Sequence, residues 1–350
     1  MISNSGTGYN PSVEEIALSD AALHWCEAAL AEVSATNAQT AHTAITAEPL
    51  RVEASHRSFY RLRVPHDSWV LMTSPPDLER NDAFVSRAEV FARHGVPVPR
   101  ILAAQHTAGW FLLSDLGSRH LEDTYGTVDE AAAIAAAIAL LPRIAQIDEP
   151  EIEPYTPARF ADELALFNDW FVTGLLGADD LPPAQADYDR LIAATQEQPQ
   201  GCVHRDYHCR NLLFDRGRLG VVDFQDALRG PLLYDLASLL RDCYYAFSEA
   251  DVDRHLDAYL GQVTDFRANT RADIRRWFDY TAIQRQLKAI GIFARLWLRD
   301  GKSSHLAYIA PLLERLVRLL QRYPELGQLQ SQLQDCTIRC AAQPDRFAGS

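Results

Sequence analysis

The sequence lacks the features that mark several common protein classes. Its N-terminus, residues 1–20, has neither the basic start nor the apolar core of a signal peptide. The longest apolar run, 131–141, is about half the length that a membrane helix needs. Positive charge is also scarce, since 33 Lys and Arg stand against 47 Asp and Glu, for a net charge of -14. Non-specific nucleic-acid binding relies on basic surface, so we expect neither a nucleic-acid nor a membrane partner.

Cysteine is scattered rather than clustered, with six residues in 350. Cys336 and Cys340 are four positions apart, but no pair of Cys or His nearby completes a zinc site. Reduced thiols in a cytoplasmic protein are the simplest interpretation. The 47% hydrophobic and 23% charged content is ordinary for a globular chain, and the length allows one large domain or two lobes.

One stretch, 203–226, carries a recognisable chemical pattern. It contains H-R-D-Y-H-C-R-N, which places Asn211 five residues after Asp206, and the segment D-F-Q begins at Asp223. The sequence D-R-G-R at 215–218 is a turn signal between two short apolar runs. The pattern predicts a loop that carries Asp206 and Asn211, a hairpin, and Asp223 at the exit of that hairpin.

Phosphoryl transfer from ATP requires this set of side chains. One carboxylate orients the attacking hydroxyl and accepts its proton, while an Asn and a second Asp hold magnesium. The stretch matches every fixed position of the kinase catalytic loop, with Gln225 in place of the Gly that usually follows Asp-Phe. We therefore predict Asp206 as the catalytic base, with Asn211 and Asp223 as ligands of Mg²⁺.

The chain before residue 114 predicts strands and the chain after it predicts mainly helices. Two strands, at the end of 52–64 and at 69–73, flank a polar turn and follow a Ser-rich loop. Such a hairpin resembles the ATP-covering hairpin of a kinase, although this loop has no glycine. A helix is expected at 83–94 and a strand at 109–113. Further helices are expected at 121–146, 157–176, 182–197, 232–247, 250–262, 272–297 and 305–322.

Together these motifs resemble the aminoglycoside phosphotransferase superfamily. Typical members have His-Gly-Asp where this chain has His-Arg-Asp, and Y-D-L-A-S-L-L at 234–240 resembles their buried Asp-Leu-Ala at a helix start. A narrower resemblance, Q-R-Q-L-K-A-I-G-I-F-A-R-L at 284–296, is to bacterial anomeric sugar kinases. These enzymes use ATP to phosphorylate the anomeric hydroxyl of N-acetylmuramate and N-acetylglucosamine in cell-wall recycling.

The resemblance implies an α+β, bilobal, protein-kinase-like fold with a small β-rich amino lobe and a larger, mainly helical carboxyl lobe. The expected divisions are a tail at 1–18, an amino lobe at 19–113, a hinge at 114–118 and a carboxyl lobe at 119–345. It also implies nucleotide contacts from the Ser-rich loop and the hinge. These residues are Ser55, His56, Arg57, Ser58, Ser114, Asp115 and Leu116.

The same resemblance implies an acceptor pocket that faces Asp206. The expected substrate-binding residues are Gln225, Gln284, Arg285 and Lys288. A cation there suits the lactyl carboxylate of N-acetylmuramate. Arg285 and Lys288 could instead be ordinary structural charges. Asp235 is expected to bond the catalytic loop from a helix start rather than to take part in chemistry.

The usual amino-lobe Lys is missing, and Met72 occupies the corresponding position. Arg57 or Arg61 could replace its phosphate contact. Two alternatives therefore stay open. One is a kinase of another small alcohol, such as an aminoglycoside or choline. The other is a pseudokinase that binds nucleotide without turnover.

Overall fold

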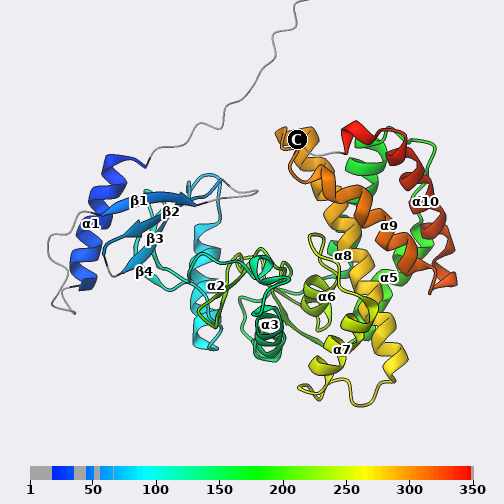
Figure 1. Ribbon diagram of the computed structural model, residues 1–350, viewed down its shortest axis with the longest axis horizontal. Coiled ribbons are helices and arrows are strands. Elements are labelled where there is room, and N and C mark those ends of the chain that lie inside the picture. Colours follow the sequence, from blue (N-terminus) through cyan, green and yellow to red (C-terminus); the bar gives the residue numbers. More distant parts are fainter. Residues whose placement is uncertain (1–17, 35–44, 51–55, 66, 348–350) are drawn as a thin grey trace, which may run out of the picture. The chain divides into compact units, whose positions relative to one another are not determined.

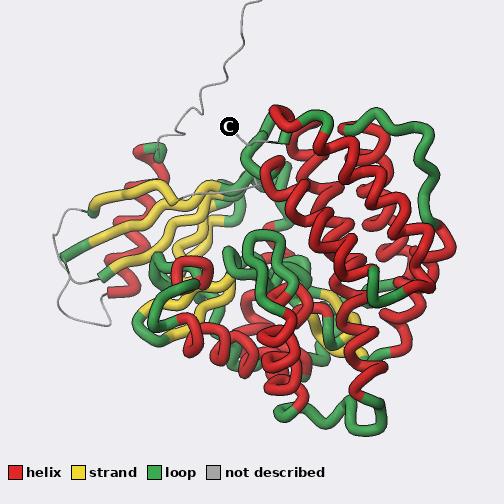
Figure 2. Tube along the Cα trace, turned by 45° about the vertical axis from the view of Figure 1, so that its right-hand side comes forward, coloured by secondary structure: helices red, strands yellow, loops and turns green. Residues whose placement is uncertain are grey.

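The computed structural model describes residues 18–34, 45–50, 56–65 and 67–347. Contacts divide the chain into two compact units. The first unit combines Met1–Asn81 with Ile101–Asp115, and the second combines Asp82–Arg100 with Leu116–Ser350. Each unit has its own secondary structure (Figure 2).

The first unit is an antiparallel sheet covered by one helix (Figure 1). The strand order is β1-β2-β3-β5-β4. Leu62, Leu71 and Leu112 pack in a common core with Cys26 and Leu30 of the helix. The elements are α1 (Asp20–Ser34), β1 (Thr46–Leu50), β2 (Ser58–Arg63), β3 (Ser68–Thr73), β4 (Ile101–Gln105) and β5 (Trp110–Ser114). The predicted hairpin is confirmed as β2 and β3, which pair from Ser58↔Thr73 to Arg63↔Ser68.

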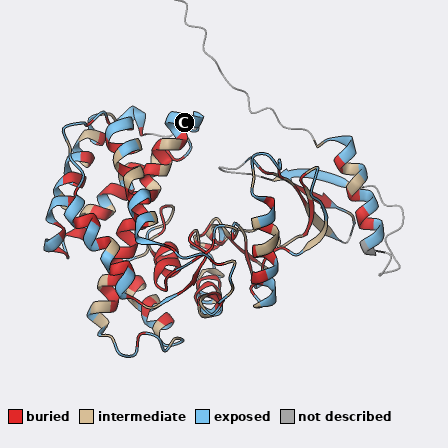
Figure 3. Cartoon of the chain, turned by 180° about the vertical axis from the view of Figure 1, so that it is seen from behind, coloured by how far each residue is buried: buried red, intermediate tan, exposed pale blue. Residues whose placement is uncertain are grey.

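The second unit is mainly helical, and buried residues run along the inner faces of its helices (Figure 3). Its helices are α2 (Asn81–Arg93, in this unit from Asp82), α3 (Glu130–Ala145), α4 (Pro157–Leu166), α5 (Gln185–Glu197), α6 (Tyr234–Leu240), α7 (Glu249–Leu260), α8 (Arg271–Asp300), α9 (Ile309–Leu320) and α10 (Gly327–Ala341). Two antiparallel strand pairs interrupt them. These are β6 (Gln200–Val203) with β9 (Leu228–Pro231), and β7 (Leu212–Asp215) with β8 (Arg218–Val221).

α8 is the central helix of this unit. It spans 30 residues, and most of the side chains from Ile274 to Leu296 are buried. Gly291 allows a close approach, because a Cβ there would lie 2.7 Å from the backbone nitrogen of Phe167. Phe167 begins a π-helical stretch, Phe167–Leu175, that continues directly from α4. The missing side chain thus lets α8 pack against the backbone where α4 changes to π geometry.

Several predicted elements need correction. The expected helix at 121–146 is a short 3₁₀ turn, Leu121–Thr124, followed by α3, because the chain turns between them at Gly126, whose φ is 71°. The expected helix at 232–247 ends at Leu240, and residues 241–247 form an irregular segment. Helix α10 was not predicted, and neither were the strands β6 and β9, which pair with each other across about 25 intervening residues.

Helix α2 falls in the second unit by its contacts, although the predicted amino lobe includes it. Phe84 stacks on Phe224 with ring centroids 5.5 Å apart, and Phe91 lies 5.7 Å from the same ring. Phe224 follows Asp223, so these contacts tie α2 to the predicted catalytic stretch. The predicted lobe and hinge boundaries stay a prediction.

All six cysteines are buried and unpaired with one another. Among the described helices, none combines the length and the apolar character that crossing a membrane would require.

We predict that Gly291→Ala lowers the free energy of unfolding by about 1–3 kcal/mol, because the added methyl forces α8 away from the backbone at Phe167. Chemical denaturation measures the change. Gly327→Ala is the matched control, because Gly327 begins α10 and a Cβ there would meet nothing within 4 Å. Equal stability of the two variants would contradict the close-approach argument.

Candidate active site

The predicted catalytic loop lies between β6 and β7. Residues 204–211 connect the two strands, and β7 pairs with β8 to form the predicted hairpin. Arg216 and Gly217 both have positive φ, 49° and 73°, as the tight turn of such a hairpin requires. The backbone N–H of Val222 then donates to the carbonyl of Asn211 at 3.0 Å, so the exit of the hairpin lies beside the loop.

The amide of Asn211 connects the three predicted residues. Its Nδ2 donates to the backbone carbonyl of Asp206 at 3.0 Å and to the carboxylate of Asp223 at 3.3 Å. Asp223 has a φ of 64°, a left-handed conformation that is uncommon for residues other than glycine and that recurs at functional sites. Gln225 donates to the other carboxylate oxygen of Asp223 at 2.7 Å. The structure thus brings Asp206, Asn211, Asp223 and Gln225 together.

This cluster fits a magnesium ion by its chemistry. Amide and carboxylate oxygens are the donor atoms that Mg²⁺ takes from proteins, and water and phosphate oxygens complete its octahedral shell. Asp223 is an exposed residue. The side-chain amide of Asn211 can rotate so that its oxygen, instead of its nitrogen, faces Asp223. Asn211 is therefore suited to hold the ion together with Asp223.

The loop backbone is braced by Asp235 at the start of α6. Its two carboxylate oxygens accept from the N–H groups of His204 at 2.6 Å and Arg205 at 2.9 Å. Arg205 has a φ of 77°, so these bonds hold a left-handed residue directly before Asp206. The prediction that Asp235 bonds the loop is confirmed.

A second brace acts on the side chain of Arg205. The buried carboxylate of Glu163 on α4 accepts from its guanidinium at 2.5 Å and lies 3.3 Å from the ammonium of Lys288 on α8. Gln284 donates to the same carboxylate at 3.3 Å, and the hydroxyl of Tyr155 donates to it as well. Glu163 therefore connects α4, the catalytic loop and α8 through buried charged groups.

Positive charges around Asp206 keep its carboxylate ionised. Burial alone would raise the pKa of Asp206, but the charges of Lys288, Arg285 and Arg205 hold this pKa well below its ordinary value. A carboxylate with such a low pKa is a weak ground-state base. It can still orient a hydroxyl group and accept the proton as negative charge leaves the attacking oxygen.

The predicted acceptor residues on α8 differ in their surroundings. The side chains of Gln284 and Lys288 are buried against Glu163. Arg285 instead has its Nη1 4.0 Å from the sulfur of Cys243, and its buried Nε finds no acceptor among the residues that the structure describes. Arg285 is therefore the more available cation near Asp206.

The predicted nucleotide residues lie mostly in the first unit. Arg57 is buried, with its Nε 3.3 Å from the hydroxyl of Ser74 and a guanidinium nitrogen 3.4 Å from Glu79. The exposed His56 donates its backbone N–H to the same carboxylate, and Ser58 begins β2. Ser55 lies outside the described residues.

The predicted hinge follows β5. Ser114 ends that strand, and the carboxylate of Asp115 accepts from Arg61 at 2.7 Å and 3.2 Å. Leu116 begins the second part of the second unit and packs beside Gly220. Met72 is fully buried in β3, so the position of the usual Lys contributes to the core. The roles of these residues in nucleotide binding stay predictions.

Sequence reasoning missed a group of residues on the irregular segment 241–247. The buried Asp242 accepts from the backbone N–H of Cys209, within the catalytic loop, at 3.0 Å. The guanidinium of Arg210 lies 3.7 Å above the ring of Tyr244 and donates to the hydroxyl of Tyr308 at 2.8 Å. The apolar pattern of 232–240 suggested an uninterrupted helix and hid this segment. An Asp and aromatic residues just beyond a buried helix were the available signal.

Comparisons with known proteins agree with this geometry. Residues 46–276 match the family described as "Phosphotransferase enzyme family". The chain is 36% identical over 291 residues to the N-acetylmuramate/N-acetylglucosamine kinase of Pseudomonas aeruginosa, covering 80% of this chain and 86% of that protein. It is 34% identical over 293 residues to the protein of the same name from Neisseria meningitidis, covering 79% and 86%.

A solved structure shows the fold. The choline/ethanolamine kinase family protein from Mesorhizobium loti superposes with a TM-score of 0.58 at 17% identity, covering 90% of this chain and 99% of that one. The predicted α+β protein-kinase-like fold is confirmed, with a sheet in the amino-terminal part and mostly helices in the carboxyl-terminal part.

We predict that Glu163→Gln lowers the free energy of unfolding at pH 7 by about 2–4 kcal/mol, because it leaves two buried cations without their counter-charge. Burial alone would raise the pKa of Glu163, but Lys288 and Arg205 lower it below its ordinary value of 4.5. The unfolded chain therefore binds a proton at higher pH than the folded one. The stabilisation is present above pH 4.5 and is lost as the pH falls through the lower folded pKa.

Denaturant unfolding from pH 7 to pH 3 tests this expectation. The difference between the wild type and Glu163→Gln should shrink below about pH 4.5. Glu153→Gln is the control, since Glu153 is exposed, and it should change stability by less than about 0.5 kcal/mol. A difference that does not depend on pH would contradict the assigned charge interaction.

Proposed function

The chain belongs to the phosphotransferase enzyme family, and from that premise we propose that it is an ATP-dependent kinase of amino sugars. The reaction transfers the γ-phosphoryl group of ATP to the anomeric hydroxyl of N-acetylmuramate or N-acetylglucosamine. The observation that carries this proposal is the hydrogen-bonded cluster of Asp206, Asn211 and Asp223, in a chain that matches sugar kinases over most of its length.

In this mechanism the protein mainly positions and stabilises charge. Asp206 accepts a hydrogen bond from the anomeric hydroxyl and receives its proton as the bond to phosphorus forms. Phosphoryl transfer has a loose transition state, in which the bond between the attacking oxygen and phosphorus is only slightly formed. The attacking hydroxyl group therefore does not need to lose its proton early, and a carboxylate of low pKa is an adequate base. Asp235 and Glu163 fix the backbone and the neighbouring side chain of the loop, which limits the motion of Asp206.

Asn211 and Asp223 are the residues that would hold Mg²⁺, with Gln225 fixing one oxygen of Asp223. When bound, magnesium supplies positive charge that offsets the negative charge of the phosphates. Nucleotide contacts are proposed from Arg57 and its neighbours His56 and Ser58, and from the backbone at 114–116. We assign no residue to the phosphate contact that an amino-lobe Lys would make. Arg57 already contacts Glu79, and Arg61 already contacts Asp115. A cytoplasmic location, where ATP is available, belongs to the same proposal.

For the acceptor, we assign the contact with the lactyl carboxylate of N-acetylmuramate to Arg285. Its Nε has no acceptor among the described residues, whereas Lys288 pairs with Glu163. Gln284 also bonds Glu163, so we now give Gln284 and Lys288 a supporting position. The cations around Asp206 are unfavourable for a polycationic aminoglycoside or for choline, which makes those acceptors the weaker alternatives. A pseudokinase is disfavoured by the assembled Asp206, Asn211 and Asp223.

The proposal predicts turnover with amino sugars. Purified protein with ATP and magnesium is assayed for ADP release with N-acetylmuramate, N-acetylglucosamine, choline, homoserine and hygromycin B. The two amino sugars should give the highest kcat/KM. Turnover of choline or an aminoglycoside alone would contradict the acceptor assignment, and ATP binding without turnover of any acceptor would favour a pseudokinase.

In the same assay Asp206→Asn should lower kcat by about 10²–10⁴-fold, the usual contribution of a positioned base. Asp189→Asn is the matched control, because Asp189 is an exposed carboxylate on α5. Loss of activity in Asp189→Asn as well would indicate a general effect on folding.

A separate prediction concerns acceptor selectivity. Arg285→Met should raise the KM for N-acetylmuramate by about tenfold, because a charge-assisted hydrogen bond to its carboxylate is lost. The KM for N-acetylglucosamine, which has no lactyl group, should change much less. Lys288→Met is the comparison variant, and it should affect both sugars alike through the loss of the pair with Glu163. Equal changes for the two sugars in Arg285→Met would contradict the assignment.

A further inference from the structure

A cavity of about 300 Å³ lies in the second unit, away from the residues assigned to the reaction. Lining residues come from the end of α6, from the segment 241–247, from Gln286 of α8, from Arg315 and Arg318 of α9, and from Arg322 just after α9. Tyr245, Phe247 and Leu319 add aromatic and apolar surface. A volume of this size is at the lower end of the range for small-molecule sites.

The walls of the cavity are strongly cationic. Four arginines line it, namely Arg241, Arg315 and Arg318 of α9, and Arg322 just after α9, and Glu249 is the one acidic residue among the lining residues. In Arg241 and Arg315 the Nε atom is buried and finds no acceptor in the parts of the chain that the structure describes. Arg318 is 64% exposed, and its guanidinium lies 3.8 Å from Glu314. Arg241 also pairs with Asp279 at 3.2 Å, so the lining guanidinium groups with the least counter-charge are those of Arg315 and Arg318 on α9.

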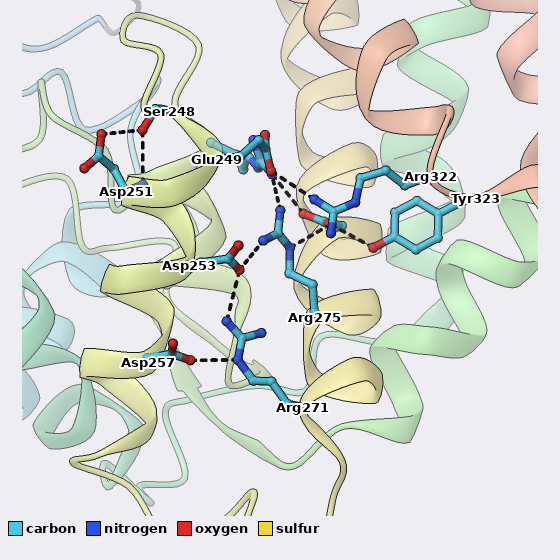
Figure 4. Close-up of polar contacts among 11 residues, drawn as sticks. Ser248, Glu249, Asp251, Asp253, Asp257, Arg271, Arg275, Arg322 and Tyr323 are labelled. Carbon is cyan, nitrogen blue, oxygen red and sulfur yellow. Dashed lines mark hydrogen bonds and ion pairs between the residues drawn. The ribbon is translucent and has the colours of Figure 1, made fainter.

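The carboxylate of Glu249 already accepts hydrogen bonds from the surrounding arginines (Figure 4). Its carboxylate accepts from Arg241 at 2.6 Å, from Arg275 at 2.6 Å and from Arg322 at 3.0 Å. The hydrogen bond with Arg241 contributes most to lowering the pKa of Glu249 to about 2, so this group is ionised at neutral pH. Arg275 also pairs with Asp279 and Asp253 on the far side of the cluster. The α9 side of the cavity keeps its excess of positive charge.

The cavity and the active site use different faces of α8. Gln286 lines the cavity, and Gln284 and Lys288 contact Glu163 behind the catalytic loop. At about 100° per residue, positions two apart on an α-helix point roughly 200° apart. Arg285, the residue assigned to the acceptor, points about 100° away from Gln286 and is not among the residues that line the cavity, so an anion there would not occupy the acceptor site.

The segment 241–247 connects the two sites. On the cavity side, Arg315 donates to the carbonyls of Cys243 at 2.8 Å and Tyr245 at 3.0 Å, and Gln286 donates to the carbonyl of Arg241 at 2.7 Å. On the other side, Asp242 accepts from the catalytic loop. A ligand that contacts Arg315 and Arg241 thus acts on the segment that holds this loop.

We propose that this cavity is a regulatory site for a small phosphate monoester. A dianionic phosphate suits a group of guanidinium donors, which bind it through paired N–H groups. The cavity has room for more than the phosphate group, and Tyr245, Phe247 and Leu319 offer a surface for the organic part of the ester. The sugar phosphate formed by the reaction is one such ester, and its choice as ligand rests on the proposed function. The assignment of an anion site to this cavity does not rest on that function.

The test measures binding without turnover. Inorganic phosphate and N-acetylglucosamine 1-phosphate are titrated separately into the full-length protein by calorimetry, at low salt and without ATP. Both should bind, the ester more tightly. Arg318→Ala and Arg322→Ala should each raise the Kd of both by about three- to tenfold, the effect of one partly exposed charge. Arg254→Ala is the matched control, since Arg254 is 66% exposed and pairs with Asp251 on α7, outside the cavity.

A variant that should bind the anion more tightly distinguishes an effect on the site from a loss of folding. Glu249→Gln removes the only lining carboxylate and should lower the Kd, with thermal unfolding showing that the protein is folded. Arg318→Lys, which keeps the charge, should stay within about threefold of the wild type. Phosphate binding equal to that of the ester would overturn the monoester assignment. Affinities unchanged in both Arg318→Ala and Arg322→Ala would place the anion elsewhere and overturn the site, even if the kinase activity is as proposed.

Discussion

The rest of the active site depends on the ion pairs that the buried carboxylate of Glu163 forms. This carboxylate holds Arg205 of the catalytic loop and Lys288 of α8 in one charged cluster that is removed from water. Such a cluster is stable only when its geometry is complete, because each unpaired buried charge costs several kcal/mol. Arg205 has a left-handed backbone and immediately precedes Asp206, so it needs this support. Asp235 fixes the backbone from the opposite side. The position and the charge of Asp206 therefore follow from packing between α4, α6 and α8.

The parts of the site that the sequence predicted are those that depend on local geometry. Asp206, Asn211 and Asp223 lie within 18 residues of one another, and the turn at Arg216 and Gly217 brings the last of them back to the loop. Asp235 was also predicted, because a carboxylate at a helix start has a limited set of partners. The long helix α8 was found from its sustained pattern, although it extends a few residues beyond the prediction.

The parts that were missed depend on contacts between distant segments. The chain leaves the helix after Leu240 because Asp242 bonds Cys209 and Arg315 bonds two carbonyls, and no local signal reports either partner. Gln284 and Lys288 both contact Glu163, more than a hundred residues earlier, and their role at the acceptor stays a prediction. Helix α2 packs on Phe224 and groups with the second unit, while the predicted lobe boundaries also stay a prediction. The sequence also could not identify a substitute for the amino-lobe Lys, because this depends on contacts between distant residues. Met72 is buried in the core, and the nearby Arg57 and Arg61 contact the carboxylates of Glu79 and Asp115.

In the proposed reaction ATP phosphorylates the anomeric oxygen of an amino sugar, and the position of the phosphate in the product is the decisive observation. The protein is incubated with ATP, magnesium and N-acetylmuramate, and the product is examined by phosphorus NMR with correlation to protons. We expect a phosphate monoester whose phosphorus couples to the anomeric proton, with the same result for N-acetylglucosamine. A phosphorus signal that couples to the protons at carbon 6, or to no sugar proton while ATP is hydrolysed, would rule out the proposed reaction.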